Sequence, residues 1–363
     1  MKLLITGACG FIGYHACLRF LREGSEVVGL DNLSRPGSYY TLQELKQQQQ
    51  FTFAHADIRC TSELHQLFKR FGPFDVVIHA AGQVAVTTSV IDPRTDFEIN
   101  AAGTLNILEL IRSSCPSAFV IYTSTNKVYG KLDDLEVCES ETRYEYKTCQ
   151  GVPESTQLDF HSPYGCSKGT AEQYVRDYAR IYGLNTLVLR QSCIYGTHQY
   201  GLEDQGWVAW FVIAAALNKS VTIYGDGKQV RDLLWVDDLV EAFRLAIEKR
   251  STLSGMILNL GGGRHNSMSI LELLALIRQN GLELQPRMAG WRPGDQKIFL
   301  SDTTRAQVVL GWKPAVSPGE GVSRLCKWVK SEKDMLTRIL VGVPAASGGL
   351  RLPPNQPQLL GSS

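Results

Sequence analysis

The sequence lacks a long apolar run and lacks an excess of charge of either sign. Its longest apolar run, residues 207–217, falls well short of the roughly 20 residues that a membrane helix needs. Lys and Arg number 37 against 36 Asp and Glu, so we expect no basic face for nucleic acid or an anionic membrane. The chain reaches Gly7 before a signal-peptide core could form. These features predict a soluble, cytoplasmic protein that binds neither nucleic acid nor membrane.

Paired cysteines and clustered histidines are also missing. The nine cysteines include no CxxC pair, and their odd number argues against a disulfide framework. The seven histidines show neither HxxxH nor HExxH spacing. We therefore expect no metal site.

Short apolar runs alternate with amphipathic ones over the first half of the chain. Strands are expected at residues 2–6, 26–30, 51–56, 75–79, 118–122 and 186–190. Helices are expected between them at residues 11–22, 61–71, 95–113 and 163–182. Several strands are apolar throughout, as parallel strands covered on both faces are. The alternation predicts an α/β fold, a Rossmann-type doubly wound parallel sheet.

The alternation stops after residue 190. Residues 235–250 and 255–260 read as a helix and a strand that return to the sheet, so 234–263 is assigned with 1–190 to the domain that carries the sheet. Residues 191–233 and 264–335 are expected to form a smaller mixed α/β lobe beside it. The segment 344–363 is rich in Pro, Gly, Gln and Ser and is predicted to be a disordered tail.

A glycine-rich loop follows the first strand. Gly7, Gly10 and Gly13 have GxxGxxG spacing, and Phe11 and Ile12 open the next helix. Such a loop lets backbone N–H groups and the helix N-terminus receive a pyrophosphate. Because the loop lies between a strand and a helix, it predicts a dinucleotide site.

Asp31 ends the second strand and selects the cofactor. A carboxylate there accepts hydrogen bonds from the adenosine ribose and disfavours a 2′-phosphate, so NAD is expected rather than NADP. Arg35 is the contrary signal, because a nearby cation can accommodate that phosphate; we interpret it as covering the adenine. The remaining expected cofactor contacts are Asn32, Ser34, Asp57, Ile58, Ala80 and Gln83.

Tyr164 and Lys168 form a YxxxK pair at the start of a predicted helix. Residues four apart share a helix face, so the ammonium would lie beside the phenol. Lowering a phenol pKa from about 10 to neutrality takes roughly 4 kcal/mol, which the ammonium and an oxidised nicotinamide would supply. Hydroxyls at the end of the preceding strand, residues 123–125, would relay a substrate proton.

The glycine loop, the YxxxK pair and the segment 124–130 resemble the extended short-chain dehydrogenase/reductase family of nucleotide-sugar epimerases and dehydratases. The resemblance implies a catalytic trio of Thr125, Tyr164 and Lys168, with NAD as a tightly held cofactor. Residues 82–89, 154–169 and 204–207 are similar to the branch that inverts C2 of a CDP-sugar of the CDP-paratose/CDP-tyvelose type. This similarity implies transient oxidation of the substrate to a keto-sugar and return of the hydride to the opposite face of the sugar.

The same resemblance assigns residues 1–190 and 234–263 to NAD binding and residues 191–233 and 264–335 to binding of the nucleotide sugar. It also implies which residues contact the substrate. The implied contacts are Thr125, Asn126, Cys193, Tyr224, Arg231, Arg292 and Asp295. The dehydratases have Asp-Glu where this chain has Asn126-Lys127, so loss of water is not expected. A UDP-hexose 4-epimerase, an NAD-dependent oxidoreductase or decarboxylase with net cofactor turnover, and a non-catalytic NAD sensor stay as alternatives. A homo-oligomer is expected.

Overall fold

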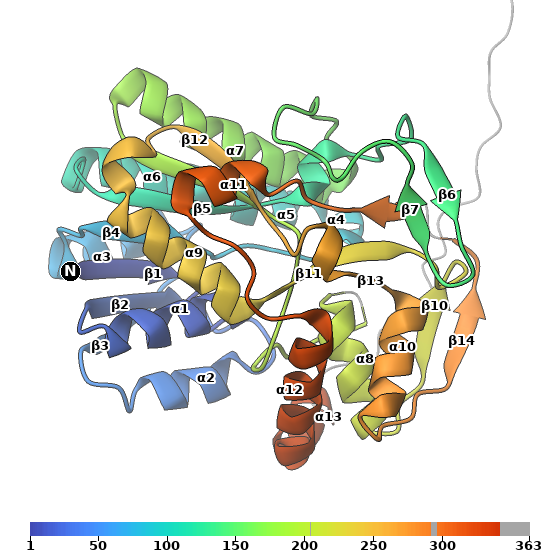
Figure 1. The fold of residues 1–363 in the computed structure, drawn as a ribbon. Coiled ribbons are helices and arrows are strands. Elements are labelled where there is room, and N and C mark those ends of the chain that lie inside the picture. Colours follow the sequence, from blue (N-terminus) through green and yellow to red (C-terminus); the bar gives the residue numbers. More distant parts are fainter. Residues whose placement is uncertain (204, 292–295, 342–363) are drawn as a thin grey trace, which may run out of the picture.

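A parallel sheet of seven strands forms the centre of the molecule, with the order β12-β8-β5-β4-β1-β2-β3. The computed structural model describes residues 1–203, 205–291 and 296–341 (Figure 1). The strands are β1 (Lys2–Thr6), β2 (Glu26–Asp31), β3 (Phe51–His55), β4 (Val76–His79), β5 (Phe119–Thr125), β8 (Asn185–Gln191) and β12 (Met256–Leu260). The predicted Rossmann-type doubly wound fold is confirmed.

Helices cover both faces of this sheet, as the apolar strands require. In β1, Leu3 and Ile5 pack on one face and Leu4 on the other, because successive side chains of a strand alternate. The first face is covered by α1 (Phe11–Arg22), α2 (Ser38–Leu45), α9 (Val236–Glu248) and α11 (Thr304–Leu310). The second is covered by α3 (Thr61–Phe71), α6 (Gly103–Ser114) and α7 (Ser162–Tyr182).

The strand order reverses at β1, which pairs with β2 on one side and β4 on the other. A reversal of this kind opens a crevice at the carboxyl ends of the strands. Register brings Thr6 level with Leu30 and His79, and His79 level with Tyr122. The segments that follow these strands, which carry the predicted site residues, therefore share one edge of the sheet.

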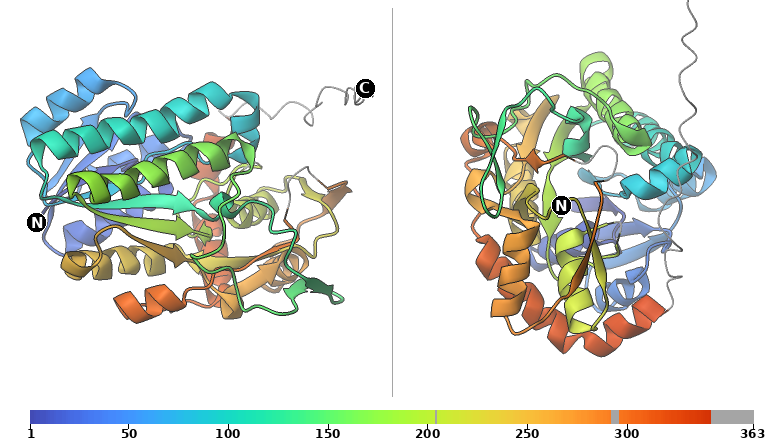
Figure 2. Two further views of the ribbon diagram at one scale, coloured as in Figure 1. Left: turned by 90° about the horizontal axis from the view of Figure 1, so that it is seen from above. Right: turned by 90° about the vertical axis from the view of Figure 1, so that its right-hand side faces the viewer.

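A second group of elements packs around its own hydrophobic core beside that edge (Figures 1 and 2). Its strands are β9 (Cys193–Tyr195), β10 (Val221–Tyr224), β11 (Val230–Trp235), β13 (Ser267–Ser269), β14 (Pro286–Ala289) and β15 (Ile298–Phe299). Its helices are α8 (Trp207–Ala216), α10 (Ile270–Gln279), α12 (Pro318–Ser331) and α13 (Lys333–Val341). We keep the expected division into two domains as a proposal, supported by these separate cores.

The predicted helix at 95–113 is confirmed as helical, but its hydrogen-bond spacing changes part-way along. The structure has α5 (Pro93–Phe97), a π-helical turn at Glu98–Ala102, and then α6. Within that turn the Asn100 amide donates to the Gln83 carbonyl and the Ser167 hydroxyl, and it accepts from the Gln83 N–H. These long-range bonds favour a local departure from α-helical spacing, which periodicity cannot reveal.

The sequence reasoning also missed several short elements, among them α2, α4 (Val86–Ile91) and the hairpin of β6 (Val137–Glu139) and β7 (Tyr144–Tyr146). The hairpin lies between the strand expected at 118–122 and the helix expected at 163–182, and it is seen at the right of Figure 1. The predicted disordered tail, 344–363, lies outside the described residues. Over the residues that are described, no helix is both long enough and apolar enough to cross a bilayer.

Candidate active site

The glycine loop packs so tightly that side chains are excluded from it. Gly7 has a φ of +68°, and a Cβ there would lie 2.8 Å from the Ala81 nitrogen. A Cβ on Gly13 would lie 2.0 Å from the Gly7 carbonyl oxygen. Gly10 precedes α1 in an extended conformation, and as glycine it offers the first-turn N–H groups no side-chain cap. The loop therefore fits a diphosphate bound at a helix N-terminus.

The Asp31 carboxylate is held at the entrance of this loop. It accepts hydrogen bonds from the N–H groups of Cys9 (2.9 Å) and Leu33 (2.8 Å), and it is almost fully buried. Burial raises the pKa of Asp31, and these backbone donors oppose that rise. A carboxylate so placed suits the ribose hydroxyls of a dinucleotide.

The other residues expected around the adenosine form a connected rim. The Asn32 amide donates to the Asp57 carboxylate (2.9 Å), and its oxygen accepts from the Ser34 N–H (3.1 Å). The Arg59 guanidinium holds the pKa of Asp57 well below its usual range. Arg35 donates to the Gln205 side chain, which comes from the second group of elements.

Ile58, Ala80 and Gln83 lie in the turns after β3 and β4. Ile58 lies against α6, where a Cβ on Gly103 would approach its Cδ1 to 2.7 Å. The Ala80 N–H donates to the Thr6 carbonyl (3.2 Å). Gln83 is buried and its side-chain amide donates to the Ala85 carbonyl (2.7 Å). These bonds hold the β1 and β4 turns together beside the glycine loop.

Thr125, Tyr164 and Lys168 come together at the end of β5. The Thr125 hydroxyl lies close enough to the Tyr164 phenol to lower its pKa. The Lys168 Nζ donates to the Thr123 carbonyl (2.6 Å) and lies 4.3 Å from the centre of the Tyr122 ring. All three residues of the predicted trio are buried. The structure thus brings the hydroxyl of Thr125 to a phenol and an amine that lie about 40 residues further along the sequence.

The expected lowering of the phenol pKa is not a property of the protein alone. Burial raises the pKa of Tyr164 to about 12, and the nearby Thr125 hydroxyl opposes this. Burial also lowers the pKa of Lys168 to about 7, so the amine is only partly charged at neutral pH. The sequence argument considered the charge beside the phenol and left out the desolvation of both groups.

Hydrogen bonds connect the end of β5, with the predicted substrate contacts Thr125 and Asn126, to Arg231 in the second group of elements. Thr125 donates to the Asn126 side-chain oxygen (3.4 Å), and Lys127 donates to the Gln296 side-chain oxygen (3.5 Å). The Arg231 guanidinium donates to the Gln296 backbone carbonyl (2.9 Å). Gln296, which was not predicted, therefore connects the catalytic end of β5 with Arg231.

Cys193 and Tyr224 lie further along the second lobe. The Trp207 indole N–H donates to the Cys193 sulfur (3.1 Å), and burial raises the pKa of that thiol to about 12. The Tyr224 carbonyl accepts from the Gln229 side chain (2.7 Å). Arg292 and Asp295, the last two predicted contacts, lie outside the described residues.

Sequence reasoning missed several residues that hold the trio in place. The Ser89 hydroxyl accepts from the Tyr164 N–H (3.1 Å), and Asn100 binds Ser167 between Tyr164 and Lys168. His79, at the end of β4, bridges the hydroxyls of Thr6 (2.7 Å) and Thr104 (3.0 Å). Only the polarity of these residues within apolar segments could have signalled them.

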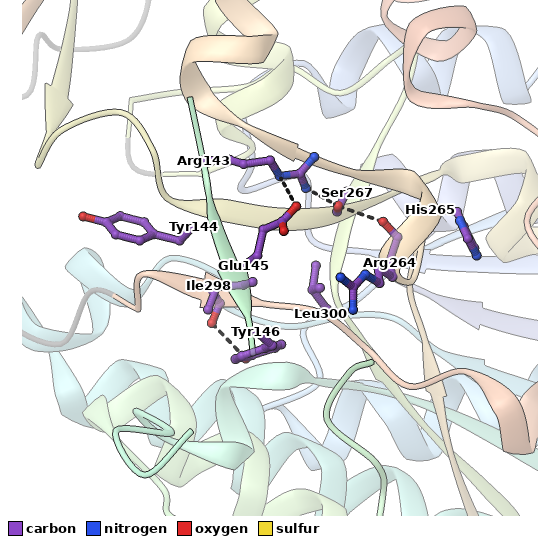
Figure 3. Close-up of a pocket in the computed structure, with 9 residues that line it drawn as sticks. All are labelled: Arg143, Tyr144, Glu145, Tyr146, Arg264, His265, Ser267, Ile298 and Leu300. Carbon is purple, nitrogen blue, oxygen red and sulfur yellow. Dashed lines mark hydrogen bonds and ion pairs between the residues drawn. The ribbon is translucent and has the colours of Figure 1, made fainter. Parts of the chain in front are cut away.

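A pocket of about 280 Å³ lies apart from the trio, beneath β7 (Figure 3). Its lining includes Arg143, Tyr146, Arg264 and His265. Arg143 is already paired there with Glu145 (3.7 Å). No cluster of three His, Cys, Asp or Glu side chains suited to a metal ion occurs among residues 1–203, 205–291 and 296–341.

A doubly wound sheet with a tight glycine loop, a buried carboxylate beside that loop and a buried Tyr–Lys pair is the arrangement of an extended short-chain dehydrogenase/reductase. The model of the NAD dependent epimerase/dehydratase family matches residues 3–261, and the chain belongs to that family. Its cofactor is NAD.

Relatives and solved structures of this family match nearly the whole chain. The chain is 44% identical to a CDP-paratose 2-epimerase of Salmonella typhi, over 91% of this chain and 100% of that protein. It is 32% identical to a UDP-glucose 4-epimerase of Mycolicibacterium smegmatis, over 92% and 99%. The structure of a Thermotoga maritima UDP-glucose 4-epimerase with UDP-glucose matches with a TM-score of 0.79 and 31% identity, covering 92% and 100%.

A second solved structure contains both a nucleotide sugar and NAD. The Bacillus cereus UDP-glucuronic acid 4-epimerase, in complex with UDP-glucuronic acid and NAD, matches with a TM-score of 0.79 and 28% identity, covering 91% of this chain and 99% of that one.

Proposed function

We propose that this protein is an NAD-dependent isomerase that inverts C2 of a CDP-hexose of the CDP-paratose/CDP-tyvelose type. The observation that carries the proposal is the 44% identity to a CDP-paratose 2-epimerase along its full length. The UDP-sugar 4-epimerases that match are less similar, at 32% identity or below for the three described above. The buried trio supports chemistry and disfavours a non-catalytic NAD sensor, which has no need of a base.

Each side chain of the site has a separate role in the proposed epimerisation. The glycine loop and Asp31 would hold NAD, which when bound would supply a hydride acceptor and a positively charged ring. Tyr164 takes the proton of a sugar hydroxyl and later gives it back. Thr125 hydrogen-bonds the phenol and the substrate hydroxyl, and Lys168 stabilises the phenolate. Arg231, with Arg292, would hold the diphosphate through paired guanidinium contacts.

The reaction needs a keto-sugar that presents its other face before reduction. No net oxidation occurs, so the cofactor need not leave between turnovers. The alternative with net cofactor turnover predicts that NAD is released readily. Heat denaturation of the purified protein, followed by assay of the supernatant for NAD, separates the two: roughly stoichiometric NAD supports the epimerase.

The substrate is tested by incubating the purified protein with CDP-paratose, then hydrolysing and analysing the sugar. We expect an equilibrium mixture of the two C2 epimers. UDP-glucose and UDP-galactose are the matched controls for the 4-epimerase alternative. Inversion of these UDP-sugars at C4, with no change of the CDP-sugar at C2, would overturn the assignment.

We further propose a cytoplasmic homo-oligomer. All nine cysteines lie in the described part of the chain and are free, which suits a reducing compartment. Exposed apolar side chains gather on α4, α5 and α7, which pack together: Ile91 (73% exposed), Phe97 (53%) and Tyr174 (44%). Light scattering should report a dimer or larger species, and Ile91→Glu should shift it toward monomer. A monomeric wild-type protein would contradict this proposal.

A further inference from the structure

Consecutive residues of β5 contact successive turns of one helix, α7. The Thr123 carbonyl accepts from the Lys168 ammonium (2.6 Å), and the Ser124 hydroxyl donates to the Glu172 carboxylate (2.7 Å). The Thr125 hydroxyl lies close to the Tyr164 phenol, as described above. Glu172 follows Lys168 by four residues and therefore lies on the same helix face.

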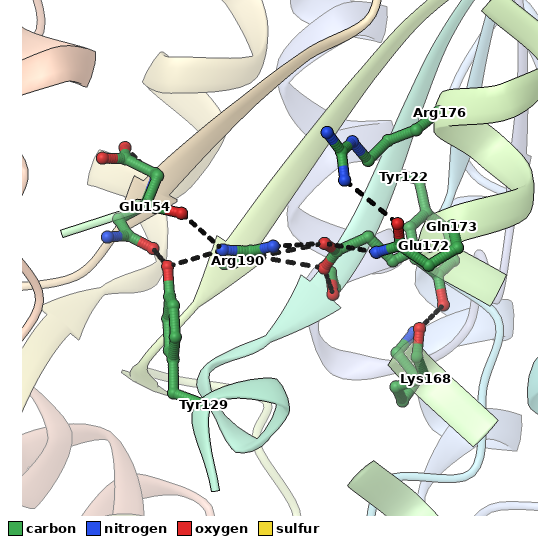
Figure 4. Close-up of polar contacts among 10 residues, drawn as sticks. Tyr122, Tyr129, Glu154, Lys168, Glu172, Gln173, Arg176 and Arg190 are labelled. Atoms are coloured by element: carbon green, nitrogen blue, oxygen red, sulfur yellow. Dashed lines mark hydrogen bonds and ion pairs between the residues drawn. The ribbon is translucent and has the colours of Figure 1, made fainter. Parts of the chain in front are cut away.

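Glu172 is a fully buried carboxylate held from several sides. The Arg190 guanidinium of β8 contacts both of its oxygens, at 2.5 and 3.1 Å. The relative exposure of the Arg190 side chain is 2% and that of Glu172 is 0%. Arg190 is itself fixed by the Tyr129 hydroxyl (2.9 Å) and the Glu154 carbonyl (3.2 Å), as Figure 4 shows.

We propose that Glu172, held by Ser124 and Arg190, is a positioning residue for Tyr164 and Lys168. It holds α7 against the ends of β5 and β8, and it sets its negative charge one helical turn from the Lys168 ammonium. The proposal concerns the same site as the proposed function and rests on it for its catalytic consequence. Nothing in that function requires a carboxylate at 172.

The electrostatic part of this role follows from the surroundings of Lys168. The charged and titratable groups that act on its amine are Asp96 from α5, His79 from β4 and Glu172 from its own helix, and the amine also lies over the Tyr122 ring of β5. Burial lowers its pKa, and Glu172 is the stronger of the two carboxylates that raise it again. Without that charge the amine would lose its proton at a lower pH than in the wild-type protein.

The direct test is a lysine titration by NMR on the NAD-bound protein labelled with [13Cε]lysine, with the Lys168 signal assigned through Lys168→Met. We expect Glu172→Gln to lower the midpoint of that signal by roughly one pH unit, the smaller end of the effect of a neighbouring opposite charge. Glu172→Asp keeps the charge and should restore most of the midpoint. This measurement uses no substrate, so it stands even if the proposed function fails.

The matched control is Glu109→Gln on α6. Glu109 also accepts from an arginine, Arg112 (2.7 Å), and from a tyrosine hydroxyl, that of Tyr178 (2.6 Å), but it lies at the surface. The control should leave the Lys168 midpoint unchanged. An unchanged midpoint in a folded Glu172→Gln protein would overturn the electrostatic role.

The catalytic consequence is tested by the pH profile of turnover. At a pH above the Lys168 midpoints of both the wild-type protein and the variant, the protonated fraction of Lys168 falls tenfold for each pH unit. Glu172→Gln should therefore lose roughly tenfold in kcat on the basic limb of the profile and much less on the acidic side. A merely structural loss would lower kcat equally at every pH and leave the limb in place. That outcome would also contradict the proposal.

Glu172→Gln leaves Arg190 buried without its partner, which destabilises proteins by several kcal/mol. The double variant Glu172→Gln/Arg190→Met removes both charges and keeps the test available if the single variant does not fold. Because Glu172 is the strongest charge acting on Lys168, the double variant should still lower the midpoint. A midpoint at the wild-type value in this variant would refute the inference.

Discussion

The substitution Gly13→Ala tests how tightly the turn between β1 and α1 is packed. The added Cβ would lie 2.0 Å from the Gly7 oxygen, 2.7 Å from the Gly7 carbonyl carbon and 2.8 Å from the Ala8 Cα. All three are backbone atoms, which cannot swing aside as a side chain can. The loop must therefore move by more than 1 Å to reach an ordinary contact of about 3.4 Å or more. Overpacking of this size typically destabilises by about 1–3 kcal/mol.

The displaced loop also carries the N–H groups expected to receive the pyrophosphate. We expect Gly13→Ala to lower the melting temperature and to leave little NAD after gel filtration, measured per protomer after heat release. Gly319→Ala is the matched control. Gly319 also lies in the first turn of a helix, α12, and a Cβ there would meet nothing within 4 Å. That control should be neutral or stabilising by up to about 1 kcal/mol.

A Gly13→Ala protein with the wild-type melting temperature and a full complement of NAD would refute this reasoning. It would mean that the loop opens without penalty and that its geometry does not determine cofactor binding. Loss of NAD with an unchanged melting temperature would locate the effect in the phosphate site alone.

Three further predictions follow from the trio and the thiols. Tyr164→Phe should reduce turnover at least about a hundredfold while NAD stays bound, and near-normal turnover would remove the phenol from its role. Because the folded pKa of Lys168 is about 7 against 10.5 in the unfolded chain, the unfolded state binds more protons between these values, and stability rises with pH across that window. Lys168→Met should therefore raise the free energy of unfolding most below pH 7, by roughly 5 kcal/mol less the contribution of the hydrogen bond lost at Thr123, and a lower melting temperature at pH 6 would contradict this. Of the nine cysteines only Cys138 and Cys166 are exposed, so a thiol reagent should modify these two rapidly in the native protein; equally rapid modification of the buried Cys9 or Cys17 would contradict this.

Local pattern was enough for the parts of the fold that repeat. Strands β1 and β2 and helix α1 begin and end within about a residue of prediction, because a buried strand and an amphipathic helix each leave a periodic trace. The glycine loop was predictable because its spacing reflects backbone sterics within eight residues. The return of β12 to the edge of the sheet also followed from its apolar run.

Pattern failed where contacts from distant segments override it. The π-turn at Glu98–Ala102 is accompanied by hydrogen bonds between Asn100 and two other segments. The sequence pattern of this helix shows a single period and gives no sign of the change in hydrogen-bond spacing. The pKa of Tyr164 was misjudged for a similar reason. Spacing places an ammonium near the phenol, but only the packed structure shows that both groups are desolvated.

The sequence alone determined which chemistry is present: the glycine loop, Asp31 and the YxxxK pair are recognisable because each is set by residues close together in the chain. The tertiary structure decided how that chemistry is held. The Glu172–Arg190 pair and the Lys127–Gln296–Arg231 line join residues 18 to 169 positions apart, and such pairings arise only when strands and helices pack. The charge state of a buried group is likewise settled by every neighbour that excludes water from it, and no local pattern records those neighbours.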